Sequence, residues 1–314
     1  SDLLLARDVD AHALVSRIRE FVRQRGLLNQ TATLDPIVTD GIANDSGRNR
    51  TAVRLGKEQY LFRRLIGQGG MSRTYLTERA SDNKRVVIKA IDGQRLQSAE
   101  LRARFAMEAE LAMSVDSAHV VNIMDFGVNE QFAMIAMEFF PRGDLKRRIE
   151  DRVSPEDAVS YLRQIALGID AINSSGIVHR DLKPGNLMFR DDDVLALADF
   201  GIAKRLGEQS MDTTQGRVVG TPAYFSPEQA MATEIDTRSD LYSAGIIFFE
   251  MLTSMRPFDA PTIEAMIYHH VHGEIPRLPH GVQEFQPIVD RLLAKEPARR
   301  FADALALVAA LDRG

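Results

Sequence analysis

The chain has 314 residues, a formal net charge of −5 and an apolar fraction of 45%, which suits one large or two medium domains with a sizeable core. The charge balance argues against nucleic acid as a partner, and the absence of cysteine excludes disulfides, thiolate catalysis and cysteine-bound metals. Without a long apolar run or a secretory signal the chain is expected to be cytoplasmic, which leaves open a membrane anchor outside it.

The first 57 residues differ from the rest in composition and in hydrophobic pattern. Residues 1–26 predict an N-terminal helical segment, because Leu14, Ile18 and Phe21 recur at helical spacing. This segment resembles the last strand and helix of a response-regulator receiver domain, although Arg7 and Asp8 stand where that family has Lys-Pro. The alternative is a helix that docks on the rest of the chain or on a partner. Residues 27–57, rich in Asn, Thr, Asp, Gly and Arg, predict a linker or regulatory arm that could fold over the cleft and inhibit.

Strand patterns begin near Tyr60 and give way to helices from Ser154. Short alternating or β-branched runs predict about five strands, at 61–66, 74–78, 85–91, 120–126 and 132–139, with a helix at 98–113. We therefore expect an α+β fold of two lobes, a small sheet lobe over 58–140 and a mainly helical lobe over 141–314. The cleft between them would bind a small ligand.

A glycine-rich turn lies between the first two of these strands. It reads Gly67-Gln68-Gly69-Gly70-Met71-Ser72, and a second strand follows it where a dinucleotide-binding fingerprint would need a helix. Glycines in a hairpin let backbone N–H groups approach phosphate oxygens. An ordinary turn is the alternative.

Lys89 closes an apolar strand, where an unpartnered ammonium would cost several kcal/mol. Phosphates and a carboxylate from the following helix would satisfy it. Glu108 shares a helical face with Phe105 and Ala112, so it is expected to point inward.

The strongest signal is the segment His179-Arg180-Asp181-Leu182-Lys183-Pro184-Gly185-Asn186, which places three charged groups and an amide beside apolar flanks. A carboxylate can accept the proton of an attacking hydroxyl, and an amide oxygen can bind Mg²⁺. Asp199, in Asp-Phe-Gly after another apolar strand, adds a second metal-ligand candidate.

Together these motifs, in this order, resemble a bacterial, eukaryotic-like (Hanks-type) Ser/Thr protein kinase over residues 60–313. The resemblance implies transfer of the γ-phosphoryl group of ATP to protein Ser and Thr hydroxyls. It implies Asp181 as catalytic base and Lys183 as the cation on the γ-phosphate. Asn186 and Asp199 would hold Mg²⁺, with Mn²⁺ as a possible substitute.

The resemblance also implies a nucleotide pocket. Lys89 would hold the α- and β-phosphates and pair with Glu108, and Met137 would be the gatekeeper. The remaining pocket residues would be Ile66, Gly67, Gly69, Gly70, Ser72, Thr74, Glu138, Phe140 and Asp144. Ser72 replaces the third glycine of the family's loop and Thr74 replaces its valine, and neither change removes a catalytic group.

The acceptor class rests on Asp181-Leu182-Lys183-Pro184 and on a segment at Gly220 and Thr221 that resembles the Ser/Thr P+1 loop. Thr221 would hydrogen-bond Asp181 and Lys183. The resemblance further implies two structural roles. Glu228 would pair with a buried arginine, best matched by Arg300, and Asp240 would hold the catalytic loop.

Regulation by phosphorylation is expected because Arg180 precedes the base. A phosphate in the activation loop could pair with Arg180 and Lys204, and the candidate acceptors are Ser210, Thr213 and Thr214. Expected partners are protein substrates, a second copy for trans-autophosphorylation and a signalling domain N-terminal to this chain.

Two other readings compete. A nucleotide-binding pseudokinase would usually lack one of Lys89, Asp181, Asn186 or Asp199, and all four are present. A small-molecule kinase of similar fold would lack the docking segment at 220–228.

Overall fold

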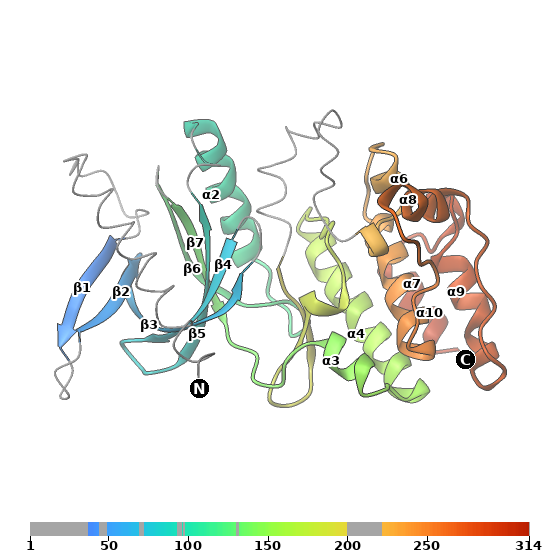
Figure 1. The fold of residues 1–314 in the computed structure, drawn as a ribbon, viewed down its shortest axis with the longest axis horizontal. Helices are drawn as coiled ribbons and strands as arrows, with labels where there is room; N and C mark the ends of the chain where they lie inside the picture. Colours follow the sequence, from blue (N-terminus) through green and yellow to red (C-terminus); the bar gives the residue numbers. More distant parts are fainter. Residues whose placement is uncertain are drawn as a thin grey trace. The chain divides into compact units, whose positions relative to one another are not determined.

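The computed structural model describes residues 37–43, 49–68, 72–92, 96, 98–129, 132–199 and 222–313. These residues form two compact units (Figure 1), the first reaching Met113 and including Asn122–Phe139. The second contains Ser114–Val121 and the chain from Phe140 onward, apart from a short stretch outside the described residues. The expected lobe boundary at 140/141 is thus shifted by one residue, and the segment 114–121 belongs to the second unit.

The described residues of the first unit form a twisted antiparallel sheet with one helix, and the fold class is the one expected. Its elements are β1 (Ile37–Ala43), β2 (Asn49–Leu55), β3 (Glu58–Gln68), β4 (Ser72–Arg79), β5 (Arg85–Asp92), α2 (Ala99–Met113), β6 (Ile123–Val128) and β7 (Phe132–Glu138). The strand order is β1-β2-β3-β4-β5-β7-β6. The sheet therefore has seven strands, two more than the sequence led us to expect.

The extra strands correct the prediction that 27–57 is a linker or arm. β2 pairs with β3 in antiparallel register, Val53 opposite Tyr60 and Leu55 opposite Glu58. Val53 and Leu55 are fully buried while Arg54 between them is exposed, the alternation of a half-buried strand. Gly56, at a φ of 54°, allows the tight turn into β3.

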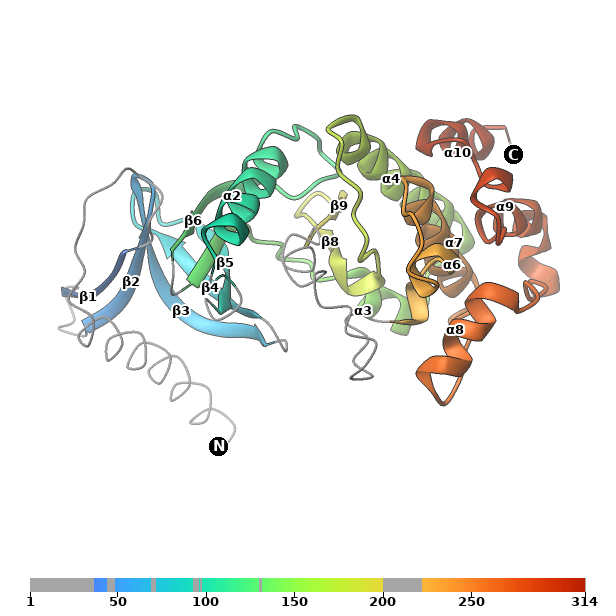
Figure 2. The same ribbon diagram turned by 90° about the horizontal axis from the view of Figure 1, so that it is seen from above.

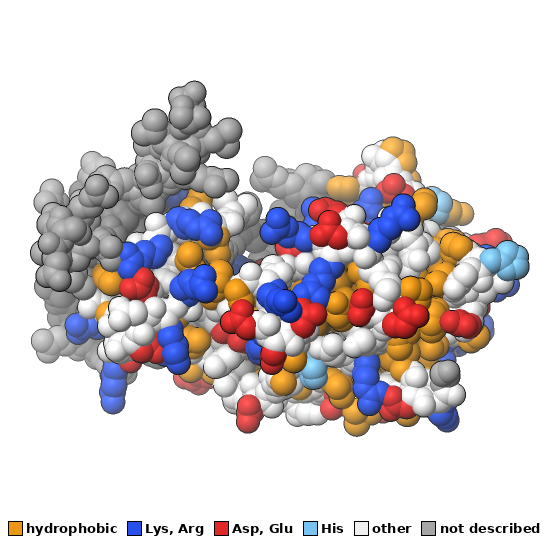
Figure 3. Space-filling model, turned by 90° about the horizontal axis from the view of Figure 1, so that it is seen from below, with side chains coloured by type: hydrophobic (Ala, Val, Ile, Leu, Met, Phe, Trp, Pro, Cys, Tyr) orange, Lys and Arg blue, Asp and Glu red, His pale blue; other side chains and the backbone are white. Residues whose placement is uncertain are grey.

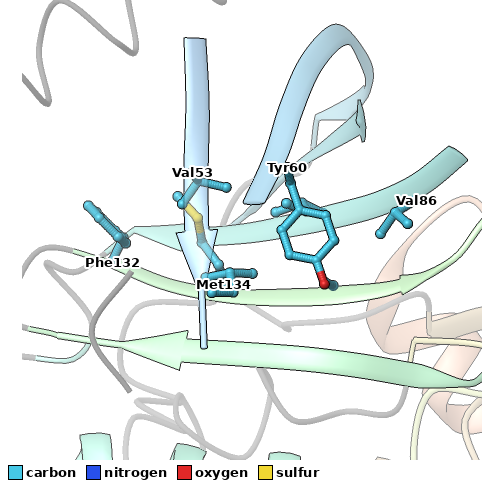
Figure 4. Close-up of a cluster of buried hydrophobic side chains, with 8 residues drawn as sticks. Val53, Tyr60, Val86, Phe132 and Met134 are labelled. Atoms are coloured by element: carbon cyan, nitrogen blue, oxygen red, sulfur yellow. The ribbon is translucent and has the colours of Figure 1, made fainter. Parts of the chain in front are cut away.

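The buried side chains of β2 belong to the hydrophobic core on one face of the sheet. Val53 and Leu55 pack with Tyr60 of β3, with Val86 and Ile88 of β5 and with Phe132, Met134 and Ala136 of β7 (Figure 4). Burial of Val and Leu side chains contributes about 1.5–3 kcal/mol each. Part of the segment expected to be an arm is therefore hydrophobic core.

The second unit is mainly helical. Its elements are α3 (Leu145–Glu150), α4 (Pro155–Ser174), η2 (Pro184–Asn186), β8 (Leu187–Phe189), β9 (Leu195–Leu197), η5 (Pro222–Tyr224), α6 (Pro227–Ala230), α7 (Arg238–Thr253), α8 (Ile263–His272), η6 (His280–Phe285), α9 (Gln286–Leu292), η7 (Pro297–Arg299) and α10 (Ala304–Leu311). The core helices α4 and α7 lie side by side, and α10 packs against α4 (Figure 2). No helix in the described part of the chain is long and apolar enough to cross a membrane.

α4 begins as its sequence predicts and packs closely on β9. Ser154 accepts a hydrogen bond from the N–H of Asp157, and Pro155 occupies the first turn. Halfway along α4, a Cβ on Gly168 would lie 2.5 Å from a Leu197 methyl and 2.6 Å from the His119 carbonyl oxygen. The glycine thus lets α4 approach the hairpin that leads into Asp199.

Candidate active site

The segment 179–186, expected to be the catalytic loop and called so below, lies in the second unit between α4 and β8, and Asp240 of α7 holds its start. One carboxylate oxygen of Asp240 accepts from the N–H of His179 at 2.8 Å, and the other accepts from the N–H of Arg180 at 3.0 Å. Asp240 is 1% exposed, and burial raises its pKa although these donors oppose the shift. The expected structural role of Asp240 is confirmed.

Three of the side chains predicted to act in catalysis or metal binding converge within this loop. The Lys183 ammonium lies 2.9 Å from Asp181 Oδ2, and the Asn186 amide nitrogen donates to the same oxygen at 3.2 Å and to the Asp181 carbonyl at 2.8 Å. Asp181's side chain is 10% exposed, so these contacts act with little screening by water. Two donors on one oxygen fix the orientation of the carboxylate.

The Asn186 amide has only one end directed at Asp181. Because its nitrogen makes both of those contacts, its oxygen, the end that a Mg²⁺ ion requires, is turned away from them. The fixed amide thus keeps an oxygen donor in a defined direction.

Asp199 lies near Asn186 because the residue before it, Ala198, is hydrogen-bonded at both of its backbone polar groups. The N–H of Ala198 donates to the Asn186 carbonyl at 2.8 Å, and His179 Nε2 lies 3.1 Å from the Ala198 carbonyl oxygen. Oxygens from an amide and a carboxylate are ligands that Mg²⁺ accepts. The described ranges contain no group of three or more His, Asp or Glu residues that could hold a metal.

Two backbone positions in this region are strained. Arg180 has a φ of 63° and Asp199 a φ of 64°, left-handed values that a side chain makes unfavourable. Such residues persist only where the surrounding structure holds them, and they concentrate at functional sites. Arg180 directly precedes the expected base Asp181, and Asp199 is itself an expected Mg²⁺ ligand.

The first unit carries Lys89 on β5 and Glu108 on α2. Lys89 pairs across the ladder with Thr74 on β4 and with Ile135 on β7, so these three side chains share a face of the sheet. Ile135 is opposite Phe126, whose ring lies 6.4 Å from that of Phe105 on α2. Lys89 therefore faces the side of the sheet that α2 covers.

Glu108 is buried on α2 together with Phe105, Ala109 and Ala112, on the face that the helical spacing predicts. Glu110 is exposed. The register and the helix face together bring Lys89 and Glu108 to the same side of the sheet.

The remaining pocket residues are spread over both units. Ile66, Gly67, Ser72 and Thr74 lie on β3 and β4 beside the glycine-rich turn, and Met137 and Glu138 end β7. Phe140 is buried in the second unit. The structure gives Asp144 a separate task, because its Oδ1 accepts from the N–H of Arg147 and caps α3.

Several predicted residues lie outside the described residues. They are Gly69 and Gly70 of the turn, Lys204, the acceptors Ser210, Thr213 and Thr214, and Gly220 and Thr221.

Glu228 of α6 and Arg300, which follows η7, form a buried ion pair in the second unit. Arg300 Nη1 and Nη2 donate to Glu228 at 2.7 and 2.9 Å, and Ser239 Oγ donates to the same carboxylate. Burial alone would raise the pKa of Glu228, but the hydrogen bonds from Arg300 and Ser239 hold it below its usual value. The expected pairing of Glu228 with Arg300 is confirmed.

Two contacts in this unit were not foreseen from the sequence. Tyr224 donates to Glu250 at 2.8 Å, where burial raises the pKa of that carboxyl. Gln229 donates from Nε2 to the Arg180 carbonyl at 2.8 Å and forms a capping box with Ser226. The Ser-x-x-Gln spacing could have indicated the box, but nothing in the sequence indicates the contact with Arg180.

On the surface, acidic and basic side chains of the described residues are interspersed on the face in Figure 3. Such mixing favours solubility and gives no single-sign field on that face.

Comparison with known proteins points to the same family as the sequence motifs. The sequence profile described as "Protein kinase domain" matches residues 60–309. A serine/threonine-protein kinase, drp72, of Corynebacterium efficiens is 32% identical over 86% of this chain and 53% of its own length. PknA of Corynebacterium glutamicum is 33% identical over 82% of this chain and 56% of its own length. The chain therefore spans about half the length of these curated relatives.

Solved structures agree on the fold. The PknI kinase domain of Mycobacterium tuberculosis superimposes with a TM-score of 0.62 at 21% identity, covering 81% of this chain and 95% of that domain. At that identity the likeness concerns architecture alone.

Proposed function

Because the chain belongs to the protein kinase family, we propose that it transfers the γ-phosphoryl group of ATP to Ser and Thr hydroxyls of proteins. One observation carries the proposal: Asp181, Lys183 and Asn186 converge on a loop that a buried carboxylate holds in place. Phosphoryl transfer depends mainly on positioning and electrostatic stabilisation, which a fixed set of charged groups supplies.

Asp181 is the proposed base. Its carboxylate would accept a hydrogen bond from the acceptor hydroxyl and take the proton as the new O–P bond forms and the bond to ADP breaks. Lys183, 2.9 Å from the Asp181 carboxylate, would offset the charge on the transferring phosphoryl group. The orientation of Asp181 by Lys183 and Asn186 supports this assignment.

Asn186 and Asp199 are the residues that would hold Mg²⁺, and Mn²⁺ also accepts their oxygen ligands. When bound, such an ion offsets the charge of the ATP phosphates. Lys89 would hold the α- and β-phosphates, with Glu108 as its carboxylate partner. Lys89 and the helix α2, which carries Glu108, lie on the same side of the sheet, and this supports that pairing.

Regulation would act through the segment 201–226. Autophosphorylation at Ser210, Thr213 or Thr214 would add a charge of about −2, which would pair with the cationic Arg180 and Lys204. A second copy of the chain would serve as substrate or partner in trans. A signalling domain outside this chain is in keeping with relatives almost twice as long as the matched part.

The test is incubation with Mg²⁺ and γ-labelled ATP, alone and with a generic basic protein, followed by phosphoamino-acid analysis. We expect label on phosphoserine or phosphothreonine. ATP binding without any transfer would point to a pseudokinase, and label found only on small alcohols would point to a small-molecule kinase.

A further inference from the structure

The peptide group that joins Arg180 to Asp181 has both of its polar ends held. Its N–H, which belongs to Asp181, lies 3.3 Å from His179 Nδ1. Its carbonyl oxygen, which belongs to Arg180, accepts from Gln229 Nε2 at 2.8 Å. The plane of this peptide sets the direction in which Asp181 leaves the backbone.

This peptide needs holding because Arg180 has a φ of 63°. Asp240 fixes the N–H of Arg180 at 3.0 Å, on the near side of the strained residue. On the far side, the contact from Gln229 fixes the carbonyl. A peptide held at only one of these points could rotate toward a relaxed conformation and carry Asp181 with it.

Gln229 uses both ends of its carboxamide. Its Oε1 accepts from the N–H of Ser226 at 2.9 Å, which closes the capping box of α6, while Nε2 reaches the Arg180 carbonyl. The contact with Arg180 spans 49 residues of sequence, whereas the box is local. One side chain thus links α6 to the catalytic loop.

We propose that Gln229 is a positioning residue for phosphoryl transfer, because its amide N–H holds the Arg180–Asp181 peptide in the orientation that directs the Asp181 carboxylate. The inference rests on the proposed kinase function. Capping of α6 uses only the side-chain oxygen of Gln229, whereas the contact with Arg180 uses only the side-chain nitrogen. Substitutions that change one of these atoms can therefore test the two roles separately.

Two substitutions divide these roles. Gln229→Glu keeps an acceptor for the capping box but removes the N–H and brings an oxygen against the Arg180 carbonyl. Gln229→Lys keeps a donor for that carbonyl but cannot accept from Ser226. Ser226→Ala is the matched control, because it weakens the capping box and leaves the Arg180 contact in place.

The experiment measures kcat, the KM for ATP, the melting temperature and amide hydrogen exchange at Asp181 in the full chain. For Gln229→Glu we expect kcat to fall about tenfold or more, since a small misplacement of a reacting group costs up to about a hundredfold. Its KM for ATP should stay near wild type. Its melting temperature should fall, because the Arg180 carbonyl loses its donor, and the Asp181 amide should exchange faster. Gln229→Lys and Ser226→Ala should melt earlier and keep kcat within about threefold of wild type.

A wild-type kcat in Gln229→Glu would overturn the proposal, as would an equal loss of kcat in Gln229→Glu and Ser226→Ala. Should the wild-type chain transfer no phosphate, the proposed function would fail by itself. Faster exchange at Asp181 in Gln229→Glu but not in Ser226→Ala would still support the positioning role, and equal exchange in both would contradict it.

Discussion

Asp240 determines the backbone of the catalytic loop from a distance of about sixty residues along the chain. Its two oxygens accept from consecutive N–H groups, of His179 and Arg180, in a site with almost no contact with water. Both donors would otherwise be buried without an acceptor, so the carboxylate stabilises the fold and the site together.

We expect Asp240→Asn to lower both the stability of the fold and the rate of phosphoryl transfer. Asparagine can accept from one of the two N–H groups, but its NH₂ would face the other donor and leave it unsatisfied. Loss of a buried acceptor costs about 1–3 kcal/mol of unfolding free energy. Urea unfolding should show this loss and the transfer assay a lower kcat; unchanged values in both would contradict the role assigned to Asp240.

At the scale of elements, β2 contributes side chains to the hydrophobic core although its mostly polar composition does not indicate a core strand. Leu55 is fully buried and packs with the strands that carry Lys89 and Met137. Deleting residues 1–57 would therefore remove core side chains, so that deletion cannot isolate an inhibitory effect of the N-terminal segment. Deleting residues 1–36 leaves both added strands and is the better test of inhibition.

Leu55→Ala should destabilise the protein by about 2–4 kcal/mol, because it opens a cavity in the core that β2 shares with β3, β5 and β7. Arg54→Ala is the matched control, since Arg54 is adjacent and exposed, and it should change stability by less than about 0.5 kcal/mol. Thermal or urea unfolding decides; equal effects of the two substitutions would mean that β2 does not belong to the core.

Gly168 tests the packing of α4 on β9. Alanine favours helices over glycine by about 1 kcal/mol, so an unconstrained site would gain stability. Here the added methyl would meet the His119 carbonyl at 2.6 Å, and backbone cannot move aside cheaply. We expect Gly168→Ala to lower the melting temperature and slow phosphoryl transfer through displacement of Asp199.

Gly281→Ala is the comparison for that experiment, because a Cβ there meets nothing within 4 Å. It should be neutral in both measurements. A stabilising Gly168→Ala would show that the close approach of α4 to the hairpin is wrong.

For the whole molecule, the unfolding free energy at acid pH should depend on the protonation of one buried histidine, His270. Burial and the nearby Lys295 lower the pKa of His270 from 6.5 to about 4. The unfolded chain therefore binds more protons than the folded chain between these values, so stability falls as the pH drops from about 6.5 to about 4, by up to about 1.4 kcal/mol per pH unit. Below 4.5 the lowered pKa of Glu228 adds a further loss.

His270→Gln should flatten the fall in unfolding free energy between pH 6.5 and 4, measured by urea unfolding at each pH. Exposed His280 offers the control, and His280→Gln should keep the wild-type slope. An unchanged slope in His270→Gln would show that His270 takes up its proton as readily in the folded as in the unfolded chain.

The sequence predicted those parts of the molecule whose chemistry is local or carried by an ordered set of motifs. The α+β class, the burial of Glu108, the pairing of Glu228 with Arg300 and the role of Asp240 are all present. β2 was missed because its apolar alternation covers only Val53 to Leu55 and follows a polar stretch. Gln229 was missed because its contact with Arg180 depends on tertiary packing, which no local pattern encodes.

The central claim is that Asp181 acts as the base in phosphoryl transfer, and the rate of single-turnover transfer in Asp181→Asn tests it most directly. The substitution keeps the size of the side chain and removes its ability to take a proton. We predict a rate at least about a hundredfold below wild type, as expected for loss of a general base, with ATP affinity changed by less than about threefold. A rate within about threefold of wild type would contradict the account.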